Sequence, residues 1–192
     1  MTLEVRPARS ADVPRLVEIS RITQAEHAAR LPDMFSGKDD PVCARTYPDI
    51  LAGRTPGAVV VAHDGARILG HAGAAIVPVE APEQRHHRTG LILDVSVDRD
   101  ARGTGVGRLL LDALADAMRG LGATDLRAQV WTGNAASESL FTAANFAPMH
   151  REFRLSLAPS LEGPARRDAL SPGYWLLIAV GALGLGLFLA MR

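Results

Sequence analysis

Several residue types are scarce in this sequence, and each shortage excludes a class of protein. The chain of 192 residues contains a single cysteine, Cys43. One cysteine cannot form a disulfide within the chain, so a disulfide framework and a multi-cysteine zinc site are excluded, and a reducing compartment is favoured. Positive charge is not in excess, because 21 lysines and arginines balance 21 aspartates and glutamates. We therefore expect no nucleic-acid partner.

Charged residues are also missing from a segment near the C-terminus, residues 173–191. At about 1.5 Å per residue, a helix over 174–191 would be about 27 Å long, close to the ~30 Å hydrocarbon thickness of a bilayer. Tyr174 and Trp175 stand where an interfacial aromatic belt would lie. These features predict a transmembrane tail anchor at 173–192. A buried core helix, or a tail that docks on the domain or on a second chain, is the alternative.

The rest of the chain divides into a body and a linker. Residues 158–172 combine prolines and a glycine with polar residues, which is typical of a linker. Residues 1–157 form the candidate domain, and the chain's 47% hydrophobic residues are enough for a core. In the tail, Ala182, Gly186 and Ala190 recur at four-residue spacing, which leaves a homodimer open.

Hydrophobic periodicity and turn residues predict a mixed α/β body. In chain order the predicted elements are a strand at 3–6, a helix that begins near Ser10 or Asp12, a loop region at 31–57 with room for one short helix, a hairpin of strands 58–62 and 67–77, a polar loop at 80–89 and a strand at 91–97. The Asp64-Gly65 pair between the hairpin strands is typical of a tight turn.

A glycine-rich loop follows the strand at 91–97. Its residues are Arg102, Gly103, Thr104, Gly105, Val106 and Gly107. Apolar residues from 106 to 121 then recur at the spacing of a buried helical face. Glycines permit positive φ and close approach, and the amides and dipole at a helix N-terminus attract negative charge. The loop is therefore a candidate anion site, and phosphate is the expected ligand.

Three glycine motifs compete for this loop. The loop of nucleoside triphosphatases needs lysine and then serine or threonine after its last glycine, whereas Arg108 and Leu109 follow Gly107. The dinucleotide fingerprint needs a third glycine where Arg108 stands, and no leading β-α-β unit surrounds the loop. The remaining pattern is arginine or glutamine, two residues, glycine, one residue, and glycine or alanine. The loop matches it in full.

This pattern resembles the acetyl-CoA loop of the GNAT N-acetyltransferase superfamily. Residues 134–146 resemble a second motif of that superfamily, NxxAxxLYxxxGF, with Ser137, Phe141 and Asn145 as departures. Asn145 is a mild departure, because asparagine tolerates the left-handed conformation that ends a helix. The resemblance covers most of residues 3–157. It implies an α/β fold of the α+β kind, a largely antiparallel central sheet flanked by helices, in which a strand at 126–131, a helix and a last strand follow the long helix.

The resemblance also implies where acetyl-CoA binds. The loop would hold the pyrophosphate, and main-chain groups around two valines of the preceding strand would hold the pantetheine arm as an added strand. An asparagine and a phenylalanine of the second motif would complete the site. The residues implied are Val95, Val97, Arg102, Gly103, Thr104, Gly105, Val106, Gly107, Arg108, Asn134 and Phe141.

Phe141 stands where many relatives have a tyrosine that is proposed to protonate the leaving CoA thiolate. Phenylalanine has no such proton to give. Either the thiolate takes a proton from water or from the new ammonium, or another residue serves, or the protein binds acyl-CoA without turnover. A core aromatic that packs beside Phe146 is a further interpretation.

Asp94 is the candidate general base. In the strand at 91–97, alternation places Asp94 on the face opposite Leu93 and Val95. An acid in an apolar strand needs a partner or a function, because burying it is costly. In similar families an acidic residue of this strand faces the acceptor. A carboxylate that binds loop amides for structural reasons is the alternative.

The sequence thus predicts an enzyme that transfers the acetyl group of acetyl-CoA to an amine of a small molecule or protein by direct attack in a ternary complex. Acetyl-CoA is the expected cosubstrate. No metal is expected, because His86 and His87 have no second ligand cluster. A non-catalytic, membrane-tethered acyl-CoA-binding module is the alternative. CoA chemistry, the single cysteine and the arginines before the tail favour a cytoplasmic domain on a single-pass anchor.

Overall fold

The computed structural model describes residues 3–36, 40–78 and 88–155. The chain falls into two units, Met1–Ala147 and Pro148–Arg192, and every helix and strand described lies in the first. The predicted linker at 158–172 and tail anchor at 173–192 lie outside the described residues. Within the described ranges, no helix has both the length and the apolar character needed to cross a membrane.

A five-stranded sheet forms the centre of the first unit, in the order β1-β2-β3-β4-β5. Its strands are β1 (Glu4–Pro7), β2 (Gly57–His63), β3 (Ile68–Pro78), β4 (Arg88–Val97) and β5 (Asp125–Arg127). Neighbouring strands are antiparallel except β4 and β5, which are parallel. The predicted hairpin of β2 and β3 is confirmed, and so is the mixed, largely antiparallel sheet.

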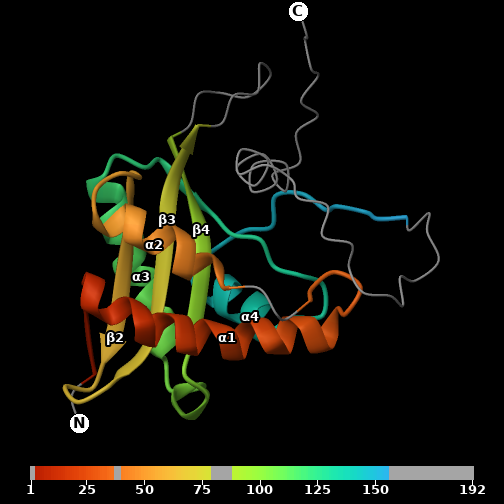
Figure 1. The fold of residues 1–192 in the computed structure, drawn as a ribbon. Coiled ribbons are helices and arrows are strands. Elements are labelled where there is room, and N and C mark those ends of the chain that lie inside the picture. The colour runs from red at the N-terminus through yellow and green to blue at the C-terminus, as the bar shows by residue number, and fades with distance from the viewer. Residues whose placement is uncertain (1–2, 37–39, 79–87, 156–192) are drawn as a thin grey trace, which may run out of the picture. The chain divides into compact units, whose positions relative to one another are not determined.

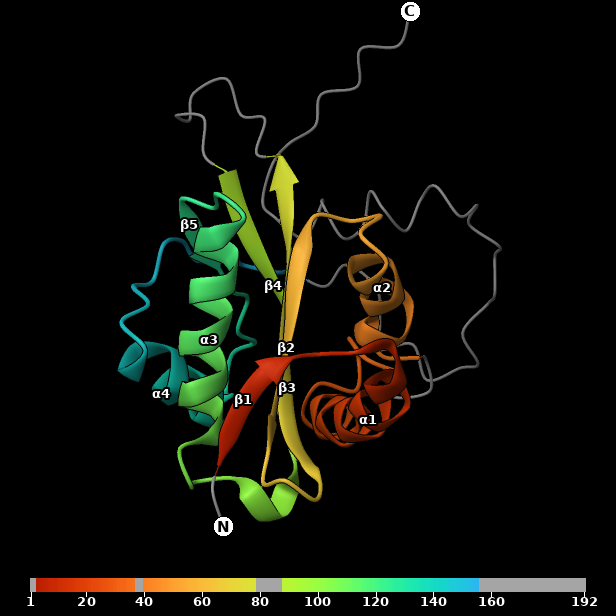
Figure 2. The ribbon, with the colours of Figure 1, turned by 90° about the vertical axis from the view of Figure 1, so that its left-hand side faces the viewer.

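Helices cover both faces of the sheet. α1 (Val13–Arg30) and α2 (Val42–Leu51) lie on one face, and α3 (Val106–Gly120) lies on the other, as Figures 1 and 2 show. α4 (Ala135–Ala143) lies on the same side as α3. Short 3-10 turns precede α1 and α3 at Ser10–Asp12 and Arg99–Ala101.

The residues of β2 explain how one sheet supports two layers of helices. Successive side chains of a strand point to opposite faces, so a strand buried on both sides is apolar throughout. Val60 and Ala62 pack in the cluster that contains the face of α3, whereas Val59 and Val61 pack with residues of α1 and α2. The core therefore consists of two clusters, one on each side of the sheet.

The buried face of α3 differs slightly from the prediction. The residues of α3 in the core cluster recur every four positions, and they are Val106, Leu110, Leu114 and Met118, with Ala113 packed beside them. Leu111 is buried as well, whereas Leu109 and Leu121, which belong to the apolar pattern of 106–121, are 42% and 41% exposed. The buried face therefore includes Leu111 and excludes Leu109 and Leu121.

A β-bulge in β4 changes which side chains share a face. Gly73 of β3 pairs with Asp94, but the next residue, Ala74, pairs with Ile92, so Leu93 is an extra residue of β4. Leu93 packs in the cluster of α1 and α2. This is also the side on which Asp94 meets α1. The prediction that Leu93 lies opposite Asp94 is wrong, because the bulge interrupts the alternation of a regular strand.

The strand expected at 126–131 is shorter than predicted. Only Asp125–Arg127 pairs with β4, opposite residues 89–91. Beyond this point residues 128–131 border a cavity instead of the sheet. The last predicted strand is not formed either, because described residues 147–155 have no regular secondary structure. An edge strand of 3 residues offers few main-chain groups with which a further strand could pair.

Candidate active site

A cavity of about 210 Å³ opens between β4 and the segment that follows β5. The two strands pair only as far as Leu91 and Arg127, so the space beyond is bordered by both segments. Residues of α1 and α4 complete its wall. Four residues that the sequence assigns to the site, Asp94, Val95, Asn134 and Phe141, line this cavity together. It is therefore the candidate active site.

The edge of β4 offers main-chain groups to this cavity. The amide of Asp98 donates to the carbonyl of Leu69 in β3 at 2.8 Å, and alternate residues of a strand direct their main-chain groups to the same side. Val95 and Val97 therefore direct their amides and carbonyls away from β3. In agreement, Arg102 Nε donates to the carbonyl of Val97 at 3.1 Å. An extended ligand could pair with this edge as an added strand.

The predicted phosphate loop has the backbone conformation that its glycines allow. Gly103 and Gly105 have φ of 75° and 90°, which other residues rarely adopt, and Gly105 is the N-cap of α3. Within the described part of the chain, the amides of residues 103–107 donate to no protein acceptor. They lie at the positive end of the α3 dipole, so they are suited to bind an anion.

Gly107 has a different function from the other two glycines. It lies in the first turn of α3, where a Cβ would be 3.1 Å from Leu140 Cδ2 of α4 and 3.8 Å from Val97 Cγ2. The absent side chain thus lets α4 approach the loop. Leu140 also lines the cavity, so this close approach places the first turn of α3 next to a residue of the cavity wall.

The two arginines of the loop bind groups of the protein itself. Arg102 donates to both carboxylate oxygens of Glu26 in α1, at 2.9 and 3.0 Å. Burial opposes ionisation of Glu26, but the bonds from Arg102 outweigh it and lower the pKa of this carboxyl. Arg108 donates to Asp112 and to the carbonyl of Ala143 at the end of α4. Arg102 therefore holds the loop against α1, and Arg108 joins the first turn of α3 to the end of α4.

The second motif forms the start and the end of α4. Asn134 is its N-cap, and its side-chain oxygen accepts a hydrogen bond from the amide of Ser137 at 3.3 Å. Asn145 has a φ of 64°, so the expected left-handed residue is confirmed. Phe141 lines the cavity and also packs edge-on against Phe146, with ring centroids 5.1 Å apart. The predicted aromatic pair is therefore present beside the site.

Asp94 borders the cavity with 16% of its side chain exposed. Its Oδ2 accepts a hydrogen bond from Ser20 of α1 at 2.5 Å, and its Oδ1 accepts one from Ser96 at 2.8 Å. An ionised carboxylate has about four lone-pair sites, so each oxygen can accept one more bond. Asp94 can therefore take a proton from a group bound in the cavity.

A buried polar cluster next to Asp94 was not predicted from the sequence. His71 of β3 and Tyr47 of α2 are completely buried. His71 Nε2 lies 3.0 Å from Ser20 Oγ, and Nδ1 lies 3.2 Å from Tyr47 Oη. Burial lowers the pKa of His71, against the opposing charge of Asp94, and burial also raises the pKa of Tyr47 well above its usual value. A histidine within the apolar run of β3 was the available signal.

Cys43 is fully buried in α2, and its thiol donates to Ser20 Oγ at 3.2 Å. Burial raises the pKa of this thiol to about 11. Only the thiolate is a competent nucleophile, so Cys43 is inert near neutral pH.

Aromatic side chains form another part of the cavity wall. Trp131 and His27 line it, and Phe35 contacts both rings, edge-on to Trp131 with centroids 5.1 Å apart and tilted to His27 with centroids 5.7 Å apart. Burial and the charge of Arg30 lower the pKa of His27. A neutral imidazole is therefore expected near pH 7. Among the described lining residues, Asp94 is then the one charged side chain.

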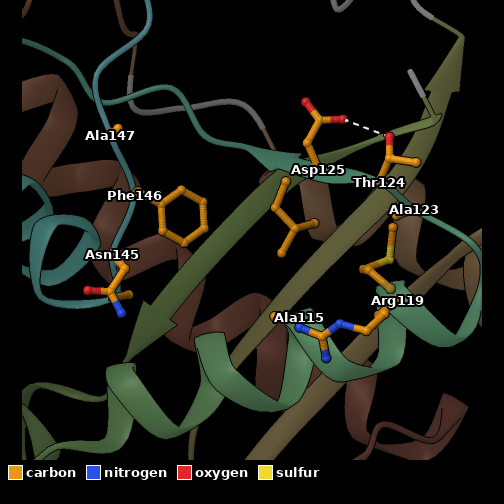
Figure 3. A pocket seen from close by; sticks show the side chains of 11 residues that line it. Ala115, Arg119, Ala123, Thr124, Asp125, Asn145, Phe146 and Ala147 are labelled. Atoms are coloured by element: carbon orange, nitrogen blue, oxygen red, sulfur yellow. Dashed lines mark hydrogen bonds between the residues drawn. The ribbon is translucent and has the colours of Figure 1, made fainter. Parts of the chain in front are cut away.

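A larger cavity, of about 340 Å³, lies elsewhere in the first unit. It is bordered by the end of α3, by β5 and by residues 144–147, and Figure 3 shows Arg119, Asp125 and Phe146 around it. It contains none of the residues assigned to the site. Size alone therefore does not identify the active site here.

The described residues contain no group of three histidine, cysteine, aspartate or glutamate side chains that could hold a metal ion. His86 and His87, the adjacent histidines of the sequence, lie outside the described residues.

Comparisons with known proteins agree with this geometry. The model of the acetyltransferase (GNAT) family matches residues 23–146, which include Asp94, the loop and the second motif. No curated protein matches the chain.

Solved structures resemble the chain in fold, at low sequence identity. A mutant of the BH1408 protein from Bacillus halodurans has a TM-score of 0.73 at 18% identity, over 81% of this chain and 99% of its own. AAC(6')-Iy, solved in complex with the bisubstrate analogue CoA-S-monomethyl-acetylneamine, has a TM-score of 0.64 at 14% identity, over 83% of this chain and 100% of its own. The aminoglycoside 6'-N-acetyltransferase AAC(6')-IG from Acinetobacter haemolyticus has a TM-score of 0.58 at 14% identity, over 81% of this chain and 99% of its own.

Proposed function

The chain belongs to the acetyltransferase (GNAT) family, and on this premise we propose that it is an N-acetyltransferase that transfers an acetyl group from acetyl-CoA to an amine. The observation that carries the proposal is a cavity in which the free edge of β4 meets the Asp94 carboxylate, together with a glycine loop before α3 whose amides donate to no acceptor within the described chain. Such an arrangement can hold an extended acyl carrier and deprotonate an acceptor at its acyl end.

The residues present fit acetyl-CoA at three places. The amides of residues 103–107 would bind the pyrophosphate, because they are unpaired within the described chain and lie at a helix N-terminus. The main-chain groups of Val95 and Val97 would pair with the pantetheine arm. Asn134 and Phe141 border the same cavity and would lie beside the thioester.

Direct attack by the amine is favoured over an acetyl-enzyme. The sole cysteine of the chain is buried and has a pKa of about 11, so it offers no thiolate to carry the acetyl group. Both substrates would therefore be bound together in a ternary complex, and proximity would supply much of the rate.

The proton balance of the reaction assigns a function to Asp94. An ammonium acceptor first loses one proton to the Asp94 carboxylate. The neutral nitrogen then attacks the thioester carbonyl, so the C–N bond forms and the C–S bond breaks. The second N–H proton, released as the amide forms, passes directly or through water to the CoA thiolate. Phe141 can supply no proton in this step.

The wall of the cavity favours one kind of acceptor. One carboxylate and a neutral aromatic surface suit an amine with a single positive charge on an apolar body, since a cation also interacts well with the face of a tryptophan. Aminoglycosides carry several ammonium groups, and the described lining offers a counter-charge for one. We therefore place this chain's acceptor among apolar monoamines, in contrast to the aminoglycoside enzymes with a similar fold.

A non-catalytic acyl-CoA-binding module is the second candidate, and Phe141 is the observation that favours it. Both candidates require acetyl-CoA to bind at the loop, but only an enzyme releases free CoA in proportion to added amine. An assay of thiol release with 2-phenylethylamine, spermidine and an aminoglycoside separates them. Release with none of these amines would favour the binding module.

The position of the protein in the cell is part of the same proposal. The charge-free run at 173–191 supports a single-pass tail anchor at 173–192 with the catalytic domain in the cytoplasm, and its small residues support pairing of two chains. Extraction of the full-length protein from membranes by high salt without detergent would contradict a spanning helix.

The experiment that tests the site is calorimetric titration of acetyl-CoA into the full-length chain in mild detergent. Gly105→Glu places bulk and negative charge in the loop at a φ of 90°. Gly65→Glu is the matched control, because Gly65 also has a φ of 90° and no atom within 4 Å, but lies in the β2-β3 hairpin. We expect the parent and Gly65→Glu to bind, and Gly105→Glu to fail. Equal binding by both variants, or none by the folded parent, would refute the proposal.

A further inference from the structure

Three polar side chains from three elements form a cluster beneath the candidate base, Asp94. Ser20 of α1 lies between Asp94 of β4 and His71 of β3, and Tyr47 of α2 lies on the far side of the imidazole. All of the contacts between neighbours fall between 2.5 and 3.2 Å. His71 and Tyr47 have no exposed surface, and Ser20 is only 3% exposed. The proposed reaction uses Asp94 alone and leaves the other three unexplained.

The hydrogen atoms of this cluster can be placed by counting donors and acceptors. An ionised Asp94 only accepts, so Ser20 must donate its hydroxyl proton to it. A serine has one proton, so it has none left for His71, and His71 Nε2 must carry the hydrogen that Ser20 accepts. A neutral imidazole with Nε2–H has a bare Nδ1, so Tyr47 must donate to Nδ1.

One further contact agrees with this direction. The Cys43 thiol donates to Ser20 Oγ, which fills its second lone pair and leaves its proton for Asp94.

We propose that Tyr47, His71 and Ser20 form a hydrogen-bond chain of fixed direction that ends on Asp94 and positions this carboxylate, in its ionised form, for the acceptor amine. They are positioning residues, because none of the three lines the cavity. The inference rests on the proposed function for the identity of the acceptor. The direction of the chain can nevertheless be tested without it.

Two features of the backbone hold the hydrogen-bond chain in place. The bulge at Leu93 brings Asp94 to the face of the sheet that α1 and α2 cover. Gly73, the partner of Asp94 in β3, leaves the space that the Tyr47 ring occupies, since a Cβ there would lie 2.4 Å from Tyr47 Cε1. Each feature interrupts regular β structure at the same pair of residues.

The hydrogen-bond chain also agrees with the charge state of each group in the cluster. The ionisable groups around His71 are Asp94 from β4 and Tyr47 and Cys43 from α2, and α1 contributes the Ser20 hydroxyl. Burial lowers the pKa of His71 and raises those of Tyr47 and Cys43. All three are therefore neutral at pH 7. The carboxylate is then the single charge, and every hydroxyl or N–H of the chain points toward it.

The first test is the tautomer of His71, measured by nitrogen-15 NMR on the full-length chain in mild detergent at pH 7.5. The ring signals that vanish in His71→Gln belong to His71. We expect a protonated Nε2 and an unprotonated Nδ1, and a shift of the Nδ1 signal in Tyr47→Phe. A protonated Nδ1, a doubly protonated ring, or an unmoved Nδ1 signal in Tyr47→Phe would overturn the inference. Acetyl-CoA is not needed, so this result is independent of the proposed function.

The second test compares two variants of similar shape, His71→Gln and His71→Met. The Gln amide can donate to Ser20 as Nε2–H does, whereas the Met side chain cannot. We expect His71→Met to lower kcat for 2-phenylethylamine by about tenfold or more and to shift the pH profile, with the KM for acetyl-CoA unchanged. His71→Gln should recover most of this loss.

Controls separate a positioning effect from a loss of folding. His63→Gln, at the end of β2, should behave as the parent. Ser20→Ala, a smaller change, should repeat the effect of His71→Met if either histidine variant fails to fold. Equal kcat and pH profiles in His71→Gln and His71→Met, or an unaffected Ser20→Ala, would overturn the inference. If the parent protein does not bind acetyl-CoA, the proposed function is refuted instead.

Discussion

Replacement of Gly73 by alanine tests whether the cluster beneath Asp94 is built as described. The added Cβ would lie 2.4, 2.5 and 2.5 Å from Tyr47 Cε1, Cζ and Oη. Carbon atoms in contact are normally about 3.5–4.0 Å apart, so the ring would have to move by about 1 Å. Tyr47 is completely buried and belongs to α2, so the ring can move only together with its surroundings.

The expected cost has two parts. Overpacking in a core costs about 1–3 kcal/mol. Displacing Oη breaks its 3.2 Å contact with His71 Nδ1, which costs about 1 kcal/mol for a net hydrogen bond, or about 1–3 kcal/mol if Nδ1 is left buried without a donor. Together these parts predict that Gly73→Ala lowers the free energy of unfolding by about 2–6 kcal/mol.

Urea and thermal unfolding of the parent and the variant measure this difference. For a domain of this size about 1 kcal/mol corresponds to about 2–4 °C, so Tm should fall by roughly 4–24 °C. Gly120→Ala is the control, because nothing lies within 4 Å of its added Cβ, and it should change stability by less than about 1 kcal/mol. Tyr47→Leu in the background of Gly73→Ala should cost less than the sum of the two single changes. A Gly73→Ala variant within about 0.5 kcal/mol of the parent would refute the packing argument.

Three further predictions concern the same site. Burial lowers the pKa of His71 below its ordinary 6.5, so the unfolded chain binds more protons at this residue than the folded chain does. The free energy of unfolding should therefore fall as pH drops from 7 to 5, and His71→Gln should flatten this pH dependence in urea titrations. An unchanged pH dependence in His71→Gln would contradict the prediction. The Cys43 thiol is buried and has a pKa of about 11. It should therefore resist a disulfide reagent at pH 8 in the folded chain and react at once in urea. Rapid labelling of the folded chain would contradict its burial. Trp131→Ala should raise the KM for 2-phenylethylamine about tenfold while the Kd of acetyl-CoA stays the same, and a KM equal to the parent's would remove Trp131 from the acceptor site.

Local patterns were enough to predict most of the elements that carry the site. The hairpin of β2 and β3, the amphipathic α3 and the glycine loop before it depend on residues close in sequence, and each was predicted with errors of a few residues at its ends. The positive φ of Gly105 and of Asn145 also follows from residue type, because glycine and asparagine tolerate that conformation best. The acetyl-CoA residues remain a prediction, although Val95, Asn134 and Phe141 do share one cavity.

Other features depend on contacts between distant parts of the chain. Ser20 and Asp94 are separated by 74 residues, and Ser20 and His71 by 51, so no periodicity within one segment reveals their meeting. In the sequence, His71 stands within the predicted strand 67–77 and Tyr47 within the loop region 31–57, and neither pattern indicates a shared cluster. Their burial in one cluster required three elements to pack together.

By itself the sequence determined the α/β class, the glycine loop before α3 and the family, because turn residues, helical spacing and loop glycines act over a few neighbours. Only the tertiary structure decided the side on which Leu93 lies, the early end of β5 and the partners of Asp94 and Arg102. The physical reason is that a bulge, a strand end and a buried hydrogen bond are each set by a partner strand or helix whose position depends on the packing of the whole domain.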